Sequence, residues 1–250
     1  RSLMKLATWN VQRLTRATSV RMSRVRPYLD AINADIWVLT ETGEDVSPGR
    51  DYQGVATTEF DRASHYPDEV WTKIWSRWPI ERLAPVSDPA RCVVARVIPP
   101  HRAPFIVYGT VLPWPSSTWR GLASKGGAAF GAALEAQASD WASLQAAHPS
   151  DDVFVMGDLN QDLCVTKPSY CGSKLNKGRL REAFTRLSLL AFTDGVNDPI
   201  RRDSPPMACI DHICGPARLS ASVRSTTRWP DAPTPAVGLS DHFGVAVEFD

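Results

Sequence analysis

The residues best suited to chemistry form the segment Gly157-Asp158-Leu159-Asn160. It follows the apolar run 153–156, and a short apolar run bounded by polar residues is typical of a buried strand. Asp158 and Asn160 are two residues apart, so an extended chain directs both side chains to the same side. A carboxylate can hold or deprotonate a water molecule, and a carboxamide can donate to an oxyanion. The pair therefore suits chemistry on a phosphate group.

Polar side chains also stand at the ends of other predicted strands. Taken singly, each is more typical of a solvated or structural group than of a catalyst. Polar groups beside a buried strand end cost free energy unless they are satisfied. Their convergence therefore indicates a metal ion, mutual hydrogen bonds or a bound ligand. The residues are Asn10 after strand 3–9, Glu41 after strand 35–40, Asp211 within strand 208–214, and Asp241 and His242 before strand 243–249.

The elements that would position these groups are many strands and a few helices. Apolar residues recur at helical spacing in 19–34 and 128–147, and a third helix surrounds Leu180, Phe184 and Leu187. Hairpins are common and a polar loop spans 162–177. We expect one domain over residues 1–250, an α/β sandwich with mixed or largely antiparallel sheets. The remaining predicted strands are 52–58, 70–76, 91–98 and 103–112 (a hairpin), 153–157 and 219–228.

The composition is that of an ordinary globular protein. The 250 residues are 43% hydrophobic and 22% charged, and the net charge of +1 creates no overall field for a polyanion. No apolar stretch reaches transmembrane length, and the N-terminal residues lack a signal-peptide layout. The five cysteines form no CxxC pair, which favours reduced thiols, although Cys164 and Cys171 could pair in an exported protein. We expect a cytoplasmic monomer.

Five motifs, in order along the chain, resemble those of the endonuclease/exonuclease/phosphatase superfamily, the deoxyribonuclease I-like group. The resemblance spans residues 9–242, and the motifs are specific as a set. It implies a four-layer α/β sandwich, in which two mixed, mostly antiparallel sheets pack face to face with helices outside. The motifs are Trp9-Asn10-Val11, Thr40-Glu41-Thr42, Gly157-Asp158-Leu159-Asn160, Ile210-Asp211-His212-Ile213 and Ser240-Asp241-His242.

The resemblance implies a hydrolase of phosphate esters that uses a divalent metal, usually Mg²⁺, with Mn²⁺ as a possible substitute. By position, Glu41 is the principal metal ligand, Asn10 lies beside it, and Asp241 lies on or near the metal. Such a hard oxygen site suits Mg²⁺, which keeps several waters and takes one or two carboxylates. Gln12 stands where several relatives carry an acidic or polar residue, and it would contact metal-bound water.

The same resemblance assigns the catalytic groups. Asp158 would orient or deprotonate the attacking water, and Asn160 would donate to a phosphoryl oxygen. His242 would contact the phosphate, with Asp211 holding its ring. A carboxylate on one ring nitrogen fixes the tautomer and favours the imidazolium. A metal and a cationic histidine on one phosphate would supply the electrostatic stabilisation that phosphoryl transfer needs.

The sequence departs from the superfamily after the strand that ends near Thr110. Many members carry a histidine there, or a tyrosine in the abasic-site nucleases, that touches the phosphate or assists the leaving group. Here the chain continues Val111-Leu112-Pro113-Trp114, and the register of Tyr108 is unsuited to the role. A metal-bound water or a good leaving group could replace the histidine, and an impaired enzyme is the alternative.

Two basic clusters and an aromatic loop bear on the substrate. Arg13 and Lys174 would track a phosphate backbone, and Trp114 would stack on a base, a sugar or a lipid group. For the basic clusters, the alternative is that the arginine and lysine side chains are simply solvated. For the tryptophans of the loop, Trp114 and Trp119, the alternative is packing against the long helix, above all for Trp119. The clusters are Arg13, Arg16, Arg21, Arg24 and Arg26, and Lys167, Lys174, Lys177, Arg179 and Arg181.

Three functions remain open on the sequence. The first is a magnesium-dependent nuclease acting on DNA or RNA, supported by the motifs and the basic clusters. The second is a phosphatase or phosphodiesterase for a small-molecule or lipid-linked ester, which fits the neutral charge and the absent histidine. The third is a binding or regulatory module on a weakened catalytic fold, although the residues of the predicted site are all present.

Overall fold

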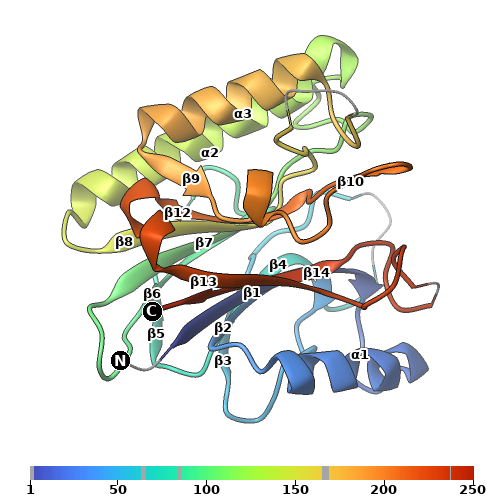
Figure 1. Ribbon diagram of the computed structural model, residues 1–250, viewed down its shortest axis with the longest axis vertical. Helices are drawn as coiled ribbons and strands as arrows, with labels where there is room; N and C mark the ends of the chain where they lie inside the picture. The colour runs from blue at the N-terminus through green and yellow to red at the C-terminus, as the bar shows by residue number, and fades with distance from the viewer. Residues whose placement is uncertain (1–2, 63–65, 84–85, 165–168, 237) are drawn as a thin grey trace.

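The computed structural model describes residues 3–62, 66–83, 86–164, 169–236 and 238–250, and two six-stranded sheets dominate it (Figure 1). The first sheet has the order β13-β14-β1-β2-β4-β3, and the second has the order β5-β6-β7-β8-β12-β9. The first sheet contains β1 (Met4–Leu14), β2 (Ile36–Gly43), β3 (Gln53–Ala56), β4 (Glu69–Ser76), β13 (Val223–Trp229) and β14 (Gly244–Phe249). The second contains β5 (Ile80–Arg82), β6 (Cys92–Val97), β7 (Phe105–Val111), β8 (Asp152–Asp158), β9 (Leu189–Ala191) and β12 (Asp211–Pro216).

Both sheets are mixed and mostly antiparallel, as the sequence predicts. Within the described strands, β1 pairs with β2 and β7 with β8 in parallel, and the other pairs are antiparallel. A separate two-stranded ribbon joins β10 (Arg202–Asp203) to β11 (Pro206–Met207). The predicted hairpin of β6 and β7 is confirmed by their antiparallel register.

Among the described residues, three α-helices cover the outer faces of the sheets, which gives four layers (Figure 1). The helix α1 (Val20–Ile32) packs on the first sheet, and α2 (Ala128–Ala147) and α3 (Lys174–Arg186) pack on the second. Short 3-10 helices lie at η1 (Lys125–Gly127), η2 (Gly195–Asn197) and η3 (Ala217–Ser222). Among the described residues, no helix has the length and apolarity needed to cross a bilayer. The single domain over residues 1–250 stays a prediction.

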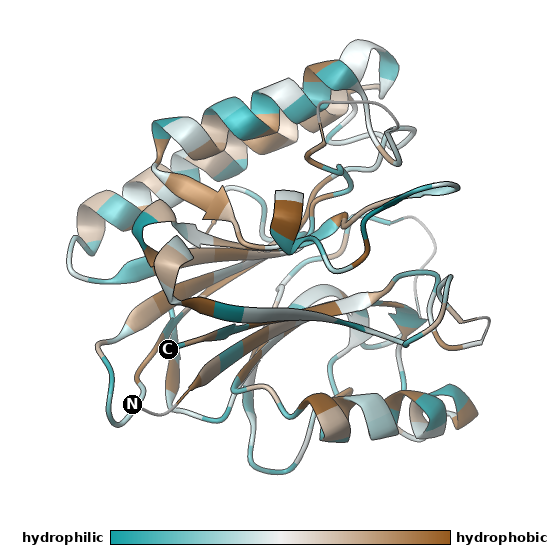
Figure 2. Ribbon diagram, in the orientation of Figure 1, coloured by the Kyte–Doolittle hydropathy of each residue, from teal (hydrophilic) through white to brown (hydrophobic). Residues whose placement is uncertain are grey.

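Alternation along the strands explains why the central ones are apolar on both faces. In β7, Val107 belongs to the core between the two sheets, whereas Tyr108 belongs to the core beneath α2 and α3. Met156 and Val155 of β8 divide in the same way. Strands buried on both faces read as continuous apolar runs, and Figure 2 shows brown colouring along them. Their polar residues are consequently left to the strand ends.

Several element boundaries differ from the sequence prediction. The helix predicted after the polar loop 162–177 begins earlier, at Lys174, because the Ser173 side chain accepts a hydrogen bond from the backbone of Asn176 and caps it. The first residues of the predicted strand 219–228 belong to the 3-10 helix η3, and the strand β13 begins only at Val223. The predicted strand 208–214 begins only at Asp211, where pairing with β8 starts.

Candidate active site

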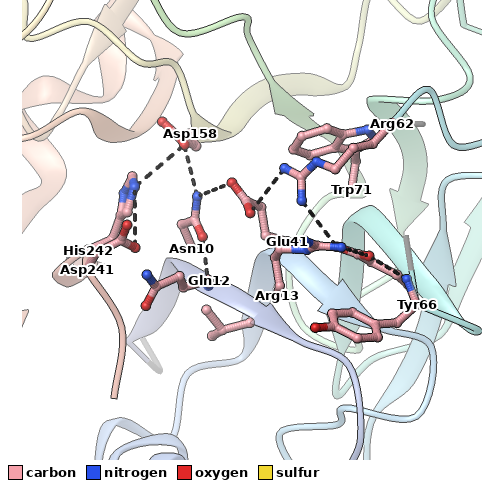
Figure 3. A network of polar contacts seen from close by, with 12 residues as sticks. Asn10, Gln12, Arg13, Glu41, Arg62, Tyr66, Trp71, Asp158, Asp241 and His242 are labelled. Atoms are coloured by element: carbon pink, nitrogen blue, oxygen red, sulfur yellow. Dashed lines mark hydrogen bonds and ion pairs between the residues drawn. The ribbon is translucent and has the colours of Figure 1, made fainter. Parts of the chain in front are cut away.

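The predicted catalytic and metal residues meet where the ends of the two sheets adjoin (Figure 3). Asn10 and Glu41 come from the neighbouring strands β1 and β2 of the first sheet. Asp158 and Asp211 come from β8 and β12 of the second sheet, where their backbones lie opposite each other in register. His242 stands just before β14 and reaches toward both carboxylates. The site is therefore assembled from five separate segments across both sheets.

An unusual backbone conformation places Asp158 at the end of β8. Gly157 has φ of 135°, and a Cβ added there would lie 2.0 Å from the carbonyl oxygen of Thr110. A side chain is therefore strained on two grounds at this position. After this residue, the Asp158 carboxylate accepts a hydrogen bond from the backbone N–H of Asn160 at 2.9 Å. Asn160 itself has φ of 53° and donates from Nδ2 to the Leu112 carbonyl at 2.8 Å.

His242 is held in place by a carboxylate and by a buried serine. Its Nδ1 lies 2.6 Å from Oδ2 of Asp211, and its Nε2 lies 4.0 Å from Oδ2 of Asp158. The Ser240 hydroxyl donates to the Asn10 carbonyl at 2.6 Å and accepts from the backbone of His242 at 3.1 Å. This serine ties the segment before β14 to the end of β1. The adjacent His212 does not take part, since Thr193 and a backbone carbonyl bracket its buried ring.

The close contact between these groups shifts their proton affinities. Burial, followed by the nearby charge of Asp211, raises the pKa of Asp158 to about 7. Burial alone lowers the pKa of His242, but the charges of Asp211 and Asp158 and the hydrogen bond to Asp211 outweigh it and raise that pKa to about 10. At neutral pH the imidazole is thus a cation. The Asp158 carboxyl stands near the midpoint of its titration, as suits a general base.

Asn10 links Asp158, the predicted catalytic carboxylate, to Glu41, the predicted metal ligand (Figure 3). Its Nδ2 donates to Glu41 at 3.2 Å and to Asp158 at 3.0 Å. Its Oδ1 accepts from the backbone N–H of Gln12 at 2.8 Å, which fixes the orientation of the amide. The side chain of Gln12 is exposed. Asp241 is also largely exposed, with an oxygen 4.0 Å from Nε2 of His242.

The donor set fits a hard divalent cation. Four carboxylates, those of Glu41, Asp158, Asp211 and Asp241, surround a single imidazolium, and the pKa of Asp158 is raised first by burial and then by the charges of Asp211 and Glu41. The Oδ1 atom of Asp211 is buried without a hydrogen-bond partner. Ligand atoms of Asp158, Asp211 and His242 also lie within 4.8 Å of one another. Because the imidazolium of His242 is a proton donor, the carboxylates rather than the ring suit the cation.

A second polar network, which the sequence analysis missed, begins at Glu41 (Figure 3). Arg62 lies 3.3 Å from Oε2 of Glu41 and equally 3.3 Å from Glu69, with its guanidinium 4.2 Å from the Trp71 ring. Glu69 is buried, and Arg13 binds both of its oxygens at 2.8 and 2.9 Å. The only signal in the sequence was a carboxylate at the start of an apolar strand, 69–76.

The predicted substrate-binding residues lie in three different surroundings. Arg13 is engaged with Glu69. Trp114 is 38% exposed in the loop after β7. Lys174 is exposed at the first position of α3, on the outer face of the second sheet.

Much of the predicted basic surface is used inside the fold. Lys177 forms a buried ion pair with Asp162 at 2.7 Å. Arg21 and Arg26 donate to backbone carbonyls. Lys167 lies outside the described residues. The clusters therefore offer fewer free cations to a polyanion than their sequence count indicates.

Tyr108 does not replace the absent histidine after β7. Tyr108 is buried and donates to Asp140 of α2 at 2.7 Å, so it faces the helices. Thr110 likewise donates to Gln137 of α2. Trp119 is buried and packs in the core beneath α2 and α3, which was the alternative favoured for it. The structure pairs none of the five cysteines in a disulfide.

Comparisons with known proteins agree with the fold described above. The model of the Endonuclease/Exonuclease/phosphatase family matches residues 7–242. An AP endonuclease from Leishmania major has a TM-score of 0.71 and 14% identity, covering 99% of this chain and 87% of that one. A Neisseria 3′ phosphatase bound to a product DNA hairpin has a TM-score of 0.67 and 17% identity, covering 99% of both chains. A truncated Caenorhabditis elegans TDP2 has a TM-score of 0.65 and 16% identity, covering 99% and 97%. No curated protein matches the sequence significantly.

The four-layer sandwich and the site at its sheet ends define a class of proteins, the deoxyribonuclease I-like phosphoesterases. The chain belongs to the Endonuclease/Exonuclease/phosphatase family, since the family model matches nearly its whole length.

Proposed function

We propose that this protein is a metal-dependent phosphoesterase, a nuclease that hydrolyses phosphodiester bonds of DNA or RNA. One observation carries the proposal: a carboxyl poised near neutrality, Asp158, faces a histidine cation, His242, beside the Asn10–Glu41 pair. A base, a cationic partner for phosphate oxygens and a carboxylate cation site are the parts that hydrolysis of a phosphate ester needs.

Each residue has a role that follows from its position. Asp158 accepts the proton of the attacking water. His242 donates from Nε2 to a phosphoryl oxygen, while Asp211 holds Nδ1 and favours the cation. Asn160 has one amide hydrogen committed to the Leu112 carbonyl, which leaves the other for the phosphate. The described loop directly after β7, residues 112–121, holds no histidine or tyrosine to serve as a separate acid, so the leaving oxygen takes its proton from water or from His242.

Glu41, Asn10 and Asp241 would hold a divalent cation, Mg²⁺ or Mn²⁺. When bound, the cation supplies Lewis-acid stabilisation of the phosphate charge. The amide of Asn10 would then orient the carboxylates of Glu41 and Asp158, to which it already donates. Gln12 is exposed beside Asn10 and suits a contact with metal-bound water.

Two observations support a nucleic-acid substrate. The AP endonuclease and the DNA-bound 3′ phosphatase named above share this fold. An exposed tryptophan, Trp114, also stands in the loop after β7, and a nucleobase can stack on it. The internal use of Lys177, Arg21 and Arg26 favours the second candidate, a phosphatase or phosphodiesterase for a small-molecule or lipid-linked ester. The cytoplasmic location and the monomeric state stay predictions.

A substrate panel tests the proposal. Purified protein is incubated with single- and double-stranded DNA and RNA, DNA with a 3′-phosphate, and small phosphate esters, in Mg²⁺, Mn²⁺ or EDTA. We expect cleavage of a nucleic acid in either metal, none in EDTA, and loss of cleavage in Asp158→Asn. Activity on small esters without cleavage of any nucleic acid would replace the nuclease with the phosphatase. No hydrolysis of any ester would overturn both.

A further inference from the structure

A surface cavity of about 690 Å³ lies beside the candidate active site and has no role in the steps above. It is bounded by three stretches, residues 59–62, 88–91 and 114–121, and we call it the tryptophan cavity. Arg62 lines it and also contacts Glu41 at 3.3 Å, so the cavity adjoins the carboxylate of the proposed metal site. A group attached to the reacting phosphate could therefore extend into it.

The loop that carries Trp114 is structured, although the ring is 38% exposed. The indole Nε1 donates to Ser116 at 2.8 Å, and the Trp114 carbonyl accepts from the backbone of Ser117 at 3.0 Å. Farther along, Trp119 and Leu122 exchange two backbone hydrogen bonds, and buried Trp119 donates to Asp88 at 2.6 Å. The fold thus presents a fixed aromatic ring to solvent, which is the arrangement of a stacking platform.

Two of the three acids that line the cavity, Asp61 and Asp88, are already partnered, and the third, Glu59, is exposed. Asp61 accepts from Nε1 of Trp71 at 2.5 Å and from Arg91 at 2.8 Å. Asp88 accepts from Trp119 as described. A ligand in the cavity therefore meets fewer unpaired negative charges than the number of acidic residues suggests.

Two arginines remain to meet an anionic ligand. Arg62 shares its charge between Glu41 and Glu69 through contacts of 3.3 Å, longer than the 2.8 and 2.9 Å contacts by which Arg13 already satisfies Glu69. Arg120 also lines the cavity, with its guanidinium 4.6 Å from the Trp119 ring and one N–H donated to the Ser87 carbonyl. Loosely held guanidinium groups bind phosphate oxygens well.

We propose that the tryptophan cavity binds one unpaired nucleobase of the substrate, on the nucleotide next to the cleaved phosphate. The base stacks on Trp114, and Arg62 binds the phosphate that joins this nucleotide to the reacting one. In a duplex both faces of each base are already stacked, so the cavity selects single-stranded or unpaired nucleic acid. This inference rests on the proposed nuclease function and specifies its substrate.

Binding without cleavage tests the inference. In an Asp158→Asn background with Mg²⁺, fluorescence anisotropy measures the affinity for a labelled single strand and for the same strand in a duplex. Trp114→Ala should weaken single-strand binding roughly 5- to 150-fold, the range expected for one stacked base. The effect on the duplex should be much smaller. Trp114→Phe keeps an aromatic ring and should recover most of the affinity.

Matched variants and strands sharpen the test. Leu122→Ala removes another exposed apolar side chain of the same loop, outside the cavity, and should change nothing. Arg62→Gln should weaken binding, whereas Arg224→Gln, at a surface ion pair with Asp250, should not. One nucleotide of the strand at a time is then replaced by an abasic sugar. At one position only, this replacement should make the affinities of the parent background and of Trp114→Ala equal.

The outcomes separate the inference from the function on which it rests. Cleavage of nucleic acid by the parent protein, with equal single-strand affinity for Trp114→Ala and the parent background, overturns the cavity assignment and leaves the nuclease intact. Equal losses on single strands and duplexes also overturn the selection of unpaired bases. If no nucleic acid is cleaved in the substrate panel, both fall together.

Discussion

At the scale of the residue, the pair of His242 and Asp211 controls the protonation of the site. The charge of Asp211 contributes most to stabilising the imidazolium of His242, whose pKa is raised to about 10. In metal-free protein, Asp211→Asn should lower the NMR titration midpoint of His242 by about 1–3 units, the effect of losing a nearby opposite charge. Asp241→Asn should lower it less, because Asp241 is exposed and 4.0 Å away. Equal shifts in the two variants would contradict the pairing.

The same pKa links His242 to stability. The folded-state pKa lies above the unfolded value of about 6.5, so the stabilisation is complete below that pH and is lost as the pH rises through about 10. In EDTA, the difference in urea-unfolding free energy between the parent and His242→Gln should therefore shrink from pH 6 to pH 10. A difference that stays constant or grows over this range would show that the imidazolium is not the stabilising form.

Asp158 and His242 should act as one catalytic unit. Asp158→Asn removes the base and should lower kcat by about 10²–10⁴-fold. The double variant Asp158→Asn/His242→Gln should lose little more than the worse single variant, because groups that act together are not additive. Asp203→Asn, at an exposed carboxylate of β10, is the control and should keep full activity. Multiplied losses in the double variant would mean that the two groups act independently.

The sequence predicted the polar residues that the structure brings together, but it did not predict the residues that hold them in place. The five motifs predicted Asn10, Glu41, Asp158 and His242, because strand ends gather such groups. Arg62 could not be found in this way, and Ser240, although it stands in the fifth motif, had no predicted role. Their partners, the Glu41 side chain and the carbonyl of the first motif, lie far away in sequence, and only the sheet pairing brings them together.

At the scale of the element, the end of β8 depends on Gly157. Gly157→Ala requires φ of 135° and places Cβ 2.0 Å from the Thr110 carbonyl, so it should destabilise the fold by about 1–3 kcal/mol and displace Asp158. Gly178→Ala in α3 is the matched control. Its Cβ meets nothing within 4 Å, and alanine should stabilise the helix by about 0.5–1 kcal/mol. Denaturant unfolding and turnover measure both, and a Gly157→Ala protein with parental stability would refute the backbone argument.

Elements with a clear period were predictable, and short ones were not. The long helix 128–147 was predicted with its observed bounds, because its apolar face repeats over five turns. The strands β5 and β9 have three residues each, too few to show alternation. The basic cluster at the start of α3 was interpreted as a contact for a phosphate backbone or as solvated side chains, but Lys177 is buried against Asp162. Charge alone does not reveal a partner that folding supplies.

At the scale of the whole molecule, the site joins the two sheets, so a bound cation should stabilise the entire fold. Asn10 and Glu41 belong to the first sheet and Asp158 to the second, and the Asn10 amide spans them. A ligand that binds only the folded state at 100 times its Kd adds about 2.7 kcal/mol. For a chain of this size that corresponds to a rise in Tm of roughly 5–11 °C.

Titration with Mg²⁺ against an EDTA baseline, followed by thermal unfolding, measures this linkage without any substrate. The parent protein should show a saturable rise in Tm. Glu41→Gln should remain folded and lose most of the rise, because it removes a principal carboxylate of the site. Glu81→Gln, on the exposed edge strand β5, should respond like the parent. If Glu41→Gln responded equally, the cation that stabilises the fold would bind elsewhere, and Glu41 would owe its position to Arg62 and Asn10 alone.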